Sequence, residues 1–189
     1  MLLGLEIPTQ GKINFIGNDL YSFDEDQRSQ IRKEEVGLIY QQQNWIKSLN
    51  VLENVAFPLT LRGYNESERN QKAMELLKMV NMESTAIQIP TELSSGQQQK
   101  ISFARALISN PILLVADEPT GNLDSKSSTA LMELFKKHNM NGNTIIMVTH
   151  DLGFLSYATR SVNMSDGEII KEYLQGDKEL EKFKMITTK

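Results

Sequence analysis

Residues 112–119 read Ile-Leu-Leu-Val-Ala-Asp-Glu-Pro, an apolar run that ends in two adjacent carboxylates and a proline. Five successive apolar residues predict a buried central strand at 112–116. Carboxylates at the end of such a strand are costly unless something balances their charge, and a hydrated Mg²⁺ does so. Asp117 and Glu118 are therefore candidate site residues. The dipeptide alone also fits a strand that merely leaves into an acidic loop.

Strand and helix patterns alternate on both sides of this run. The predicted elements are strands at 36–40, 112–116 and 144–149, helices at 96–109, 126–138 and near 152–158, and a hairpin at Asp166-Gly167. This alternation predicts an α/β fold with a mostly parallel sheet and helices on both faces. Because ligands of such sheets bind at the carboxyl ends of the strands, we expect the functional residues to gather there.

The segment between the first two of these strands is helical in character. Apolar residues recur at helical spacing over 52–59, where Pro58 is expected to end or kink the helix. Residues 66–80 carry an amphipathic pattern. Together they predict an inserted helical subdomain.

The first 35 residues predict smaller elements. Residues 12–16 alternate like a half-buried strand that runs into a turn at 17–19. Residues 24–33 are polar helix formers, and Ser22 is a candidate cap for that helix.

Composition excludes several classes of protein. The net charge is −4 and no Lys/Arg cluster is present, so we expect no nucleic-acid partner. The absence of cysteine excludes disulfides and thiolate metal sites. No apolar run approaches the ~20 residues of a membrane-spanning helix, so any role at a membrane is expected to come through a partner.

The helix at 96–109 begins with a second informative string, Leu-Ser-Ser-Gly-Gln at 93–97. Ser94, followed at the third position by Gln97, matches a capping box. The amino end of such a helix offers free N–H groups and partial positive charge, which suit a phosphate. By itself, the pattern also fits an ordinary well-capped helix.

The longer strings resemble those of one family. Residues 93–100, Leu-Ser-Ser-Gly-Gln-Gln-Gln-Lys, resemble the signature sequence of ATP-binding cassette (ABC) ATPases, with Ser95 in place of the commoner glycine. Residues 112–118 resemble the Walker B strand of this family. Residues 119–124, Pro-Thr-Gly-Asn-Leu-Asp, resemble its D-loop.

The resemblance extends from residue 1 to about 173, and it implies a P-loop NTPase-like ABC ATPase core. The implied organisation is an ABC ATPase domain at 1–173, incomplete at its amino end, with a helical subdomain at about 42–109. A polar C-terminal tail would follow at 174–189.

The resemblance also implies roles for single residues, with ATP and Mg²⁺ as cofactors. Asp117 would hold Mg²⁺ through water, and Glu118 would act as general base on the attacking water. His150, in Val-Thr-His-Asp, matches the switch histidine that contacts the γ-phosphate; a lone histidine is otherwise more often structural. Gln41 matches the Q-loop glutamine, which touches Mg²⁺ or the lytic water, although it also fits a plain polar loop. His138 matches no motif and is expected at the surface.

Other residues would act between subunits. Ser94, Ser95, Gly96 and Gln97 would bind the ATP held by a second ABC subunit. Asp124 of the D-loop would lie at the dimer interface. Trp45 and Ile46 would face an integral-membrane permease, with core packing as the alternative for Trp45.

No phosphate loop of the form G-x-x-x-x-G-K-[ST] occurs in the 189 residues. Residues 2–11 resemble the stretch that follows this loop, so Met1 is expected to fall inside the helix that the loop begins. The N-terminal strands and the loop would then be absent. We expect a fragment of a longer reading frame or a truncated gene, with no measurable ATPase activity on its own.

The leading hypothesis is the ATP-hydrolysing motor subunit of an ABC transporter. It would act as a homodimer or heterodimer, cytoplasmic and peripheral on the inner face of the plasma membrane through its permease. Short strings of the sequence resemble those of the ABC branch that serves macrolide export, lipoprotein release and cell division. The alternative is a non-catalytic interaction subunit that donates its signature motif to a complete ATPase. A DNA-repair or chromosome ATPase would need coiled-coil heptads or zinc-binding cysteines, which are absent.

Overall fold

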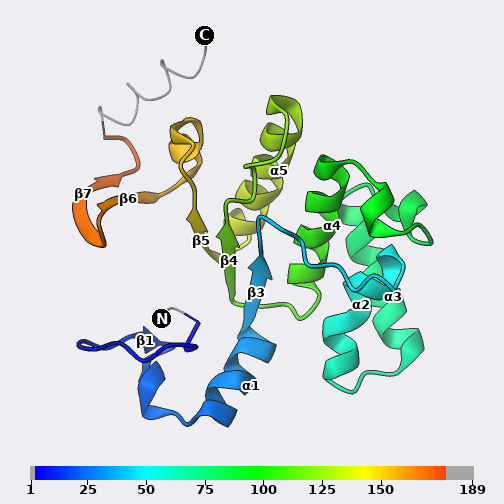
Figure 1. Cartoon of the computed structure of the whole chain (residues 1–189), viewed down its shortest axis with the longest axis horizontal. Coiled ribbons are helices and arrows are strands. Elements are labelled where there is room, and N and C mark those ends of the chain that lie inside the picture. Colours follow the sequence, from blue (N-terminus) through cyan, green and yellow to red (C-terminus); the bar gives the residue numbers. More distant parts are fainter. Residues whose placement is uncertain (1–2, 178–189) are drawn as a thin grey trace.

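Three parallel strands form the centre of the fold, which a computed structural model describes for residues 3–177 (Figure 1). They are β3 (Val36–Ile39), β4 (Leu113–Asp117) and β5 (Thr144–Val148), and β4 lies in the middle. Because all three run in the same direction, their carboxyl ends meet at one edge of the sheet. The predicted α/β class and the predicted parallel sheet are confirmed.

The strands pair in register on both sides of β4. Val36 lies opposite Leu113, and Leu113 lies opposite Thr144. Leu114 and Ala116 in β4 are almost completely buried, as the apolar run predicts.

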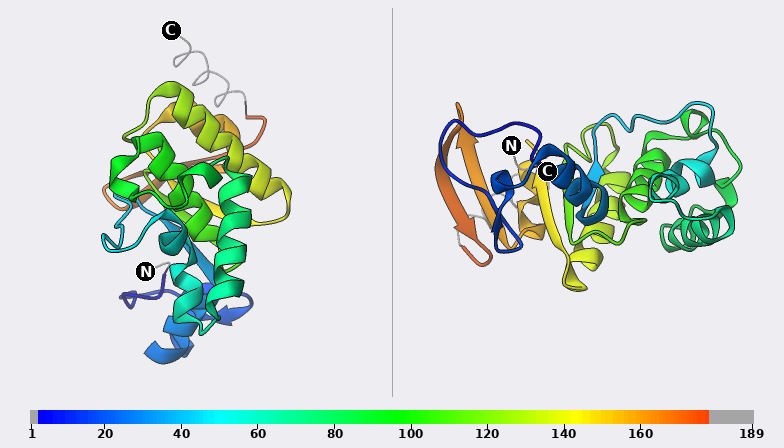
Figure 2. Two further views of the ribbon diagram at one scale, coloured as in Figure 1. Left: turned by 90° about the vertical axis from the view of Figure 1, so that its right-hand side faces the viewer. Right: turned by 90° about the horizontal axis from the view of Figure 1, so that it is seen from below.

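The remaining elements surround this sheet (Figures 1 and 2). They are the strands β1 (Asn14–Phe15), β2 (Asn18–Asp19), β6 (Arg160–Ser165) and β7 (Glu168–Leu174), the α-helices α1 (Glu25–Glu35), α2 (Val51–Leu61), α3 (Glu66–Met79), α4 (Ser95–Leu107) and α5 (Ser125–Met140), and the 3₁₀ helices η1 (Leu20–Ser22), η2 (Glu83–Thr85), η3 (Pro90–Glu92) and η4 (Leu152–Tyr157). The β1–β2 and β6–β7 pairs are antiparallel hairpins, the second of them turning at the predicted Asp166-Gly167.

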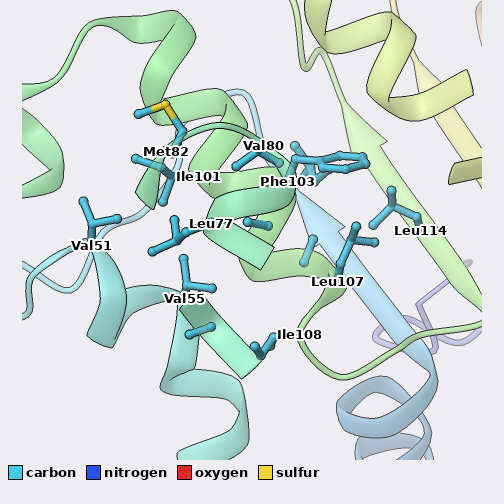
Figure 3. Packing of buried hydrophobic residues seen from close by; sticks show 14 of the residues in the cluster. Val51, Val55, Leu77, Val80, Met82, Ile101, Phe103, Leu107, Ile108 and Leu114 are labelled. Atoms are coloured by element: carbon cyan, nitrogen blue, oxygen red, sulfur yellow. The ribbon is translucent and has the colours of Figure 1, made fainter. Parts of the chain in front are cut away.

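Helix α4 lies between two layers, with α2 and α3 on one side and β3 and α5 on the other. Figure 3 shows Ile101 of α4 near Leu77 of α3 and Val55 of α2. On the other side, the Phe103 ring meets the Phe135 ring of α5 edge-on, with centroids 5.1 Å apart. Each fully buried side chain of this size contributes roughly 1.5–3 kcal/mol to stability. The position of α4 is therefore fixed from both sides.

The close approach of α4 to the sheet depends on Gly37 in β3. A Cβ atom at this position would lie 2.4 Å from the carbonyl oxygen of Ala106 in α4. It would also lie 2.9 Å from Cδ1 of Leu114. Only a residue without a side chain allows the helix and the strand to pack at this distance.

The cap of α1 differs from the sequence prediction. Asp24 caps this helix, because its Oδ1 accepts the backbone N–H of Gln27 at 2.8 Å and the Gln27 side chain closes the capping box. Ser22 instead belongs to η1 and donates its hydroxyl to the carbonyl oxygen of Asp19 at 2.7 Å. The prediction for Ser22 was therefore wrong.

The hairpin formed by β1 and β2 differs from the prediction of a strand at 12–16 followed by a turn at 17–19. Its turn is made by Ile16 and Gly17, which have φ angles of 49° and 78°, whereas 18–19 form β2. Two consecutive residues with positive φ fit the twist of a tight hairpin, which explains the earlier turn.

Pro58 does not end its helix. α2 continues to Leu61, although Pro58 cannot donate a backbone hydrogen bond. Val55 and Leu59, on either side of Pro58 along the helix, are fully or almost fully buried. Tertiary packing therefore outweighs the lost hydrogen bond.

Within residues 3–177, no helix is long and apolar enough to cross a membrane. The prediction for Met1 and most of the predicted tail, at 178–189, lie outside the described residues.

Candidate functional site

The carboxyl ends of the three parallel strands bring four predicted site residues to one edge of the sheet, the upper edge in Figure 1. Gln41 follows β3, Asp117 ends β4 with Glu118 directly after it, and His150 follows β5. The order β3-β4-β5 places the two carboxylates between the glutamine and the histidine. Long-range topology, rather than proximity in sequence, assembles this group.

The side chains of Glu118 and His150 are in direct hydrogen-bond contact. Glu118 Oε1 lies 2.7 Å from Nδ1 of His150 and accepts the backbone N–H of His150 at 3.1 Å. The backbone N–H of Glu118 in turn donates to the carbonyl oxygen of Val148 at 2.9 Å. The side chain of Glu118 is 20% exposed and that of His150 is 81% exposed. The carboxylate is therefore fixed, whereas the imidazole remains open to a ligand.

Glu118 has a left-handed backbone, with φ of 45°. This conformation is unfavourable for a residue with a side chain, and it is often found where function constrains geometry. Here it occurs where the chain leaves β4, between the strand and the loop 119–124.

Gln41 lies against that same loop. Its Nε2 is 3.0 Å from the position that a Cβ of Gly121 would occupy, and the carbonyl oxygen of Glu118 is 3.5 Å from that position. The amide of Gln41 is thus close to the loop that follows the two carboxylates. Gly121 leaves the space that the amide occupies.

The second predicted group lies at the amino end of α4. Ser94 is the N-cap: its Oγ accepts the N–H of Gln97 at 3.4 Å, and the Gln97 side chain accepts the N–H of Ser94 at 3.0 Å. The predicted capping box is confirmed. Ser94, Ser95 and Gln97 are exposed, and Gly96 is half-buried. The capping box uses the N–H groups of Ser94 and Gln97, so those of Ser95 and Gly96 are the groups that an anion can bind at this helix start.

One serine, Ser127, lies between Asp124 and this helix start. It caps α5, and its carboxylate accepts the backbone N–H of Ser127 at 2.9 Å and the Ser127 hydroxyl at 2.7 Å. These hydrogen bonds lower the pKa of Asp124. A Cβ at Gly96 would lie 2.7 Å from Ser127 Oγ, so Gly96 allows the two helix starts to meet.

A family model described as ABC transporter matches residues 1–121. The chain belongs to the ABC transporter family. An ABC transporter ATP-binding protein of Methanocaldococcus jannaschii, MJ1508, is 43% identical over 167 residues, which span 88% of this chain and 75% of that protein.

Two further relatives extend the comparison. The macrolide export ATP-binding/permease protein MacB of Campylobacter jejuni is 39% identical, and the match spans 89% of this chain but only 26% of that protein. This similarity is consistent with the predicted macrolide-export branch. The dimeric cassette MJ0796, solved with ADP and phosphate, aligns with a TM-score of 0.82 at 37% identity, covering 91% of this chain and 76% of that one.

One exposed carboxylate of this ABC cassette, that of Asp117, is a suitable ligand for Mg²⁺. Asp117 is exposed at the edge of the sheet, and Mg²⁺ prefers carboxylate oxygens while keeping several waters. Among the described residues, no three His, Asp or Glu side chains form a complete metal site. Asp117 would therefore hold the ion together with water and phosphate oxygens.

The structure corrects the prediction for His138 of this cassette. The ring is partly buried and lies edge-on to Phe103, with centroids 6.0 Å apart, and its Nε2 has no hydrogen-bond partner within the described part of the chain. Burial lowers the pKa of His138. The sequence prediction placed His138 at the surface because its neighbours at the helix end are polar, and it missed the contact with Phe103 of α4.

The two histidines of the cassette are expected to titrate on opposite sides of the ordinary value. Hydrogen bonding to Glu118 raises the pKa of His150, whereas burial lowers that of His138. The stabilising His150–Glu118 interaction is therefore complete below about pH 6.5 and is lost as pH rises through the raised pKa. An NMR titration of the two imidazole C–H signals measures both values.

Glu118→Gln serves as the test within this titration. We expect it to lower the pKa of His150 towards the ordinary value, because the neutral amide no longer favours the imidazolium. His138 acts as an internal control, since nothing connects it to Glu118. An unchanged His150 titration in the variant would contradict the pairing.

Sequence reasoning missed the side chains that hold the loop after β3. Asn54 of α2 is fully buried and donates its amide to the carbonyl oxygens of Ile46, Leu49 and Asn50. Arg105 of α4 donates to the carbonyl oxygen of Gln43. Buried polar residues inside predicted helices are the signal that was available, since such groups need partners.

Trp45 is half-buried and packs against the core, in line with the core-packing alternative. Ile46 is also half-buried. Their predicted contact with a permease stays a prediction.

Proposed function

We propose that this chain forms the greater part of the ATP-hydrolysing motor of an ABC transporter. The observation that carries the proposal is the 2.7 Å contact between Glu118 and His150 at the carboxyl edge of a parallel sheet, beside Asp117. A fixed carboxylate next to an open imidazole suits the activation of water beside a terminal phosphate. The family membership of the chain supports the same reading.

In the proposed mechanism, Glu118 accepts the proton of the attacking water through its carboxylate. His150 donates its Nδ1–H to Glu118, which leaves the exposed Nε2 for a γ-phosphate oxygen. Gln41 orients the water from the neighbouring strand. Mg²⁺, when bound at Asp117, would neutralise the developing charge on the phosphate oxygens.

The signature residues Ser94–Gln97 are proposed to act on the ATP of a second ABC subunit. Their exposure at a capped helix start supports this role. Asp124 would lie at the same dimer interface, because Ser127 links it to Gly96. The dimeric form of the similar cassette MJ0796 gives further support.

The partner that the motor moves is proposed to be an integral-membrane permease, with the subunit peripheral on the inner face of the plasma membrane. MacB, of which this chain matches about a quarter of the length, is named as an ATP-binding/permease protein. Macrolide-type export is the branch that this similarity favours.

The test uses the chain with and without an added phosphate loop. The 189 residues contain no G-x-x-x-x-G-K-[ST] motif, so we expect the chain alone to release no measurable phosphate from ATP. A fusion with an upstream segment that supplies this motif and its preceding strand is expected to hydrolyse ATP. EDTA should abolish this activity.

Two results would contradict the proposal. One is a folded fusion that binds ATP yet releases no phosphate with Mg²⁺ present. The other is Mg²⁺-dependent hydrolysis by the unfused chain, which would show that the phosphate loop is dispensable.

The exposed signature also supports a second candidate, a non-catalytic subunit that completes the site of a partner ATPase. It predicts that the unfused chain raises the hydrolysis of a complete cassette whose own signature serine has been replaced. No increase at saturating concentrations of the chain would exclude this role.

A further inference from the structure

Residues 41–50, which lie between β3 and α2, form no helix or strand. Side chains of α4 and α2 hold it in place. Gln99 of α4 accepts the side-chain amide N–H of Gln43 at 2.6 Å, and Asn54 of α2 accepts the backbone N–H of Ile46 at 3.0 Å. The loop that begins with Gln41 is therefore attached to the helix whose amino end carries the signature.

Arg105 strengthens this attachment. Its guanidinium lies over the Trp45 ring, 4.5 Å from the centroid, and donates to the carbonyl oxygens of Gln43 and Asn44. Burial lowers the pKa of Arg105 to about 10. A desolvated guanidinium on an aromatic face is a strong contact, so Trp45 and α4 are expected to move together.

One side chain connects this loop directly to the signature. Gln98 accepts the indole N–H of Trp45 at 2.8 Å through Oε1, and it donates through Nε2 to the carbonyl oxygen of Leu93 at 2.8 Å. The orientation of its amide is fixed, because an indole N–H only donates and a carbonyl oxygen only accepts. Leu93 immediately precedes the N-cap residue Ser94. Two hydrogen bonds of a single residue therefore span the distance from Trp45 to the start of α4.

We propose that Gln98 is a positioning residue that couples the loop 41–46 to the signature residues 93–97. A partner that displaces Trp45 would pull on Gln98 and thereby shift the Leu93 carbonyl and the helix start beside it. The proposal rests on the proposed function for its meaning, since it links the loop that carries Gln41 to the surface that would meet another subunit's ATP. The coupling itself is a property of the folded chain and needs neither nucleotide nor permease.

Trp45 provides the measurement, because it is the single tryptophan of the chain. Its indole N–H gives one isolated signal in a ¹⁵N-correlated NMR spectrum. Ser94→Ala, which removes the hydroxyl that caps α4, is expected to move this indole signal by more than a linewidth. The same substitution in a Gln98→Glu background is expected to leave it unmoved. The introduced carboxylate keeps an acceptor for the indole but has no N–H for the Leu93 oxygen.

Asn65→Ala is the matched control. Asn65 caps α3 in the same manner, with its side chain accepting the N–H of Glu68 at 3.0 Å. Its replacement weakens a helix start that Gln98 does not touch, so the indole signal should stay in place. A shift as large as that of Ser94→Ala would overturn the proposal. So would an unmoved signal in Ser94→Ala, or a full shift that persists with Gln98→Glu.

The reverse experiment covers a Gln98 variant that fails to fold. Trp45→Phe removes the indole N–H but keeps an aromatic ring beneath Arg105. Because coupling is reciprocal, the amide signals of Ser95 and Gly96 are expected to move in this variant. Unmoved signals would overturn the proposal. Neither experiment measures hydrolysis, so a negative result here is distinct from failure of the fused cassette to hydrolyse ATP.

Discussion

Replacing Glu118 with glutamine is expected to lower ATP hydrolysis by the fused cassette by about 100- to 10,000-fold, the usual contribution of a general base. The amide is nearly the same size, so the backbone bond to Val148 should persist. ATP binding should persist too, because the proposed role of the carboxylate is to act on water rather than on the nucleotide. The measurements are steady-state phosphate release and equilibrium binding of ATP, made on the same preparation.

Glu172→Gln is the control for this substitution. Glu172 is a carboxylate in β7 that pairs with Arg160 at 2.6 Å, away from the strand ends that carry the site. It should leave the rate of hydrolysis unchanged. A Glu118→Gln cassette that keeps most of its activity would show that another group accepts the proton.

Replacing Gly37 with alanine is expected to destabilise the folded chain by about 3 kcal/mol or more, at the upper end of the range for overpacking. The new methyl group would meet the Ala106 carbonyl oxygen at 2.4 Å. A backbone atom inside a buried helix cannot rotate away, so either α4 or β3 must move. Urea denaturation followed by far-UV circular dichroism measures the loss, or shows that the variant no longer folds.

Gly63→Ala separates this clash from the cost of adding any side chain to a glycine. Gly63 has a φ of 80° and open space where its Cβ would lie, so its replacement carries backbone strain alone, about 1 kcal/mol. A Gly37→Ala variant no less stable than Gly63→Ala would contradict the packing argument.

Local signals in the sequence predicted the local structure well. The capping box of Ser94 and Gln97 is visible from two residues, and both of its hydrogen bonds are present. The run at 112–116 predicted a buried strand because every position is apolar, but β4 begins one residue later, at Leu113, and Ile112 is 43% exposed. The prediction of Ser22 as the cap of α1 failed because it overlooked Asp24 and the Gln27 side chain that completes its capping box.

The parts that depended on distant contacts were not predictable in the same way. Pro58 favours a helix end by itself, and only the burial of its neighbours against other helices overrides it. His138 looks like a surface residue until Phe103, 35 residues earlier, is placed beside it. Gln98 belongs to a polar string, and its two partners became visible only in the fold.

For the candidate site, the sequence placed Glu118 and His150 at the ends of strands. The order of the strands in the sheet brings these two residues into contact. The spacing of apolar residues along the sequence carries no information about that order. The positive φ of Glu118 was equally hidden, since glutamate has no preference for this conformation.

At position 118, the left-handed backbone favours glycine, whereas the contact with His150 requires a carboxylate. Glycine at 118 would relieve roughly 1 kcal/mol of left-handed strain, but it would remove the carboxylate that contacts His150. Screens that select only for heat resistance should therefore enrich substitutions at 118 that remove the proposed general base. A search for more stable variants of this cassette therefore has to keep Glu118 and introduce its stabilising substitutions at other positions.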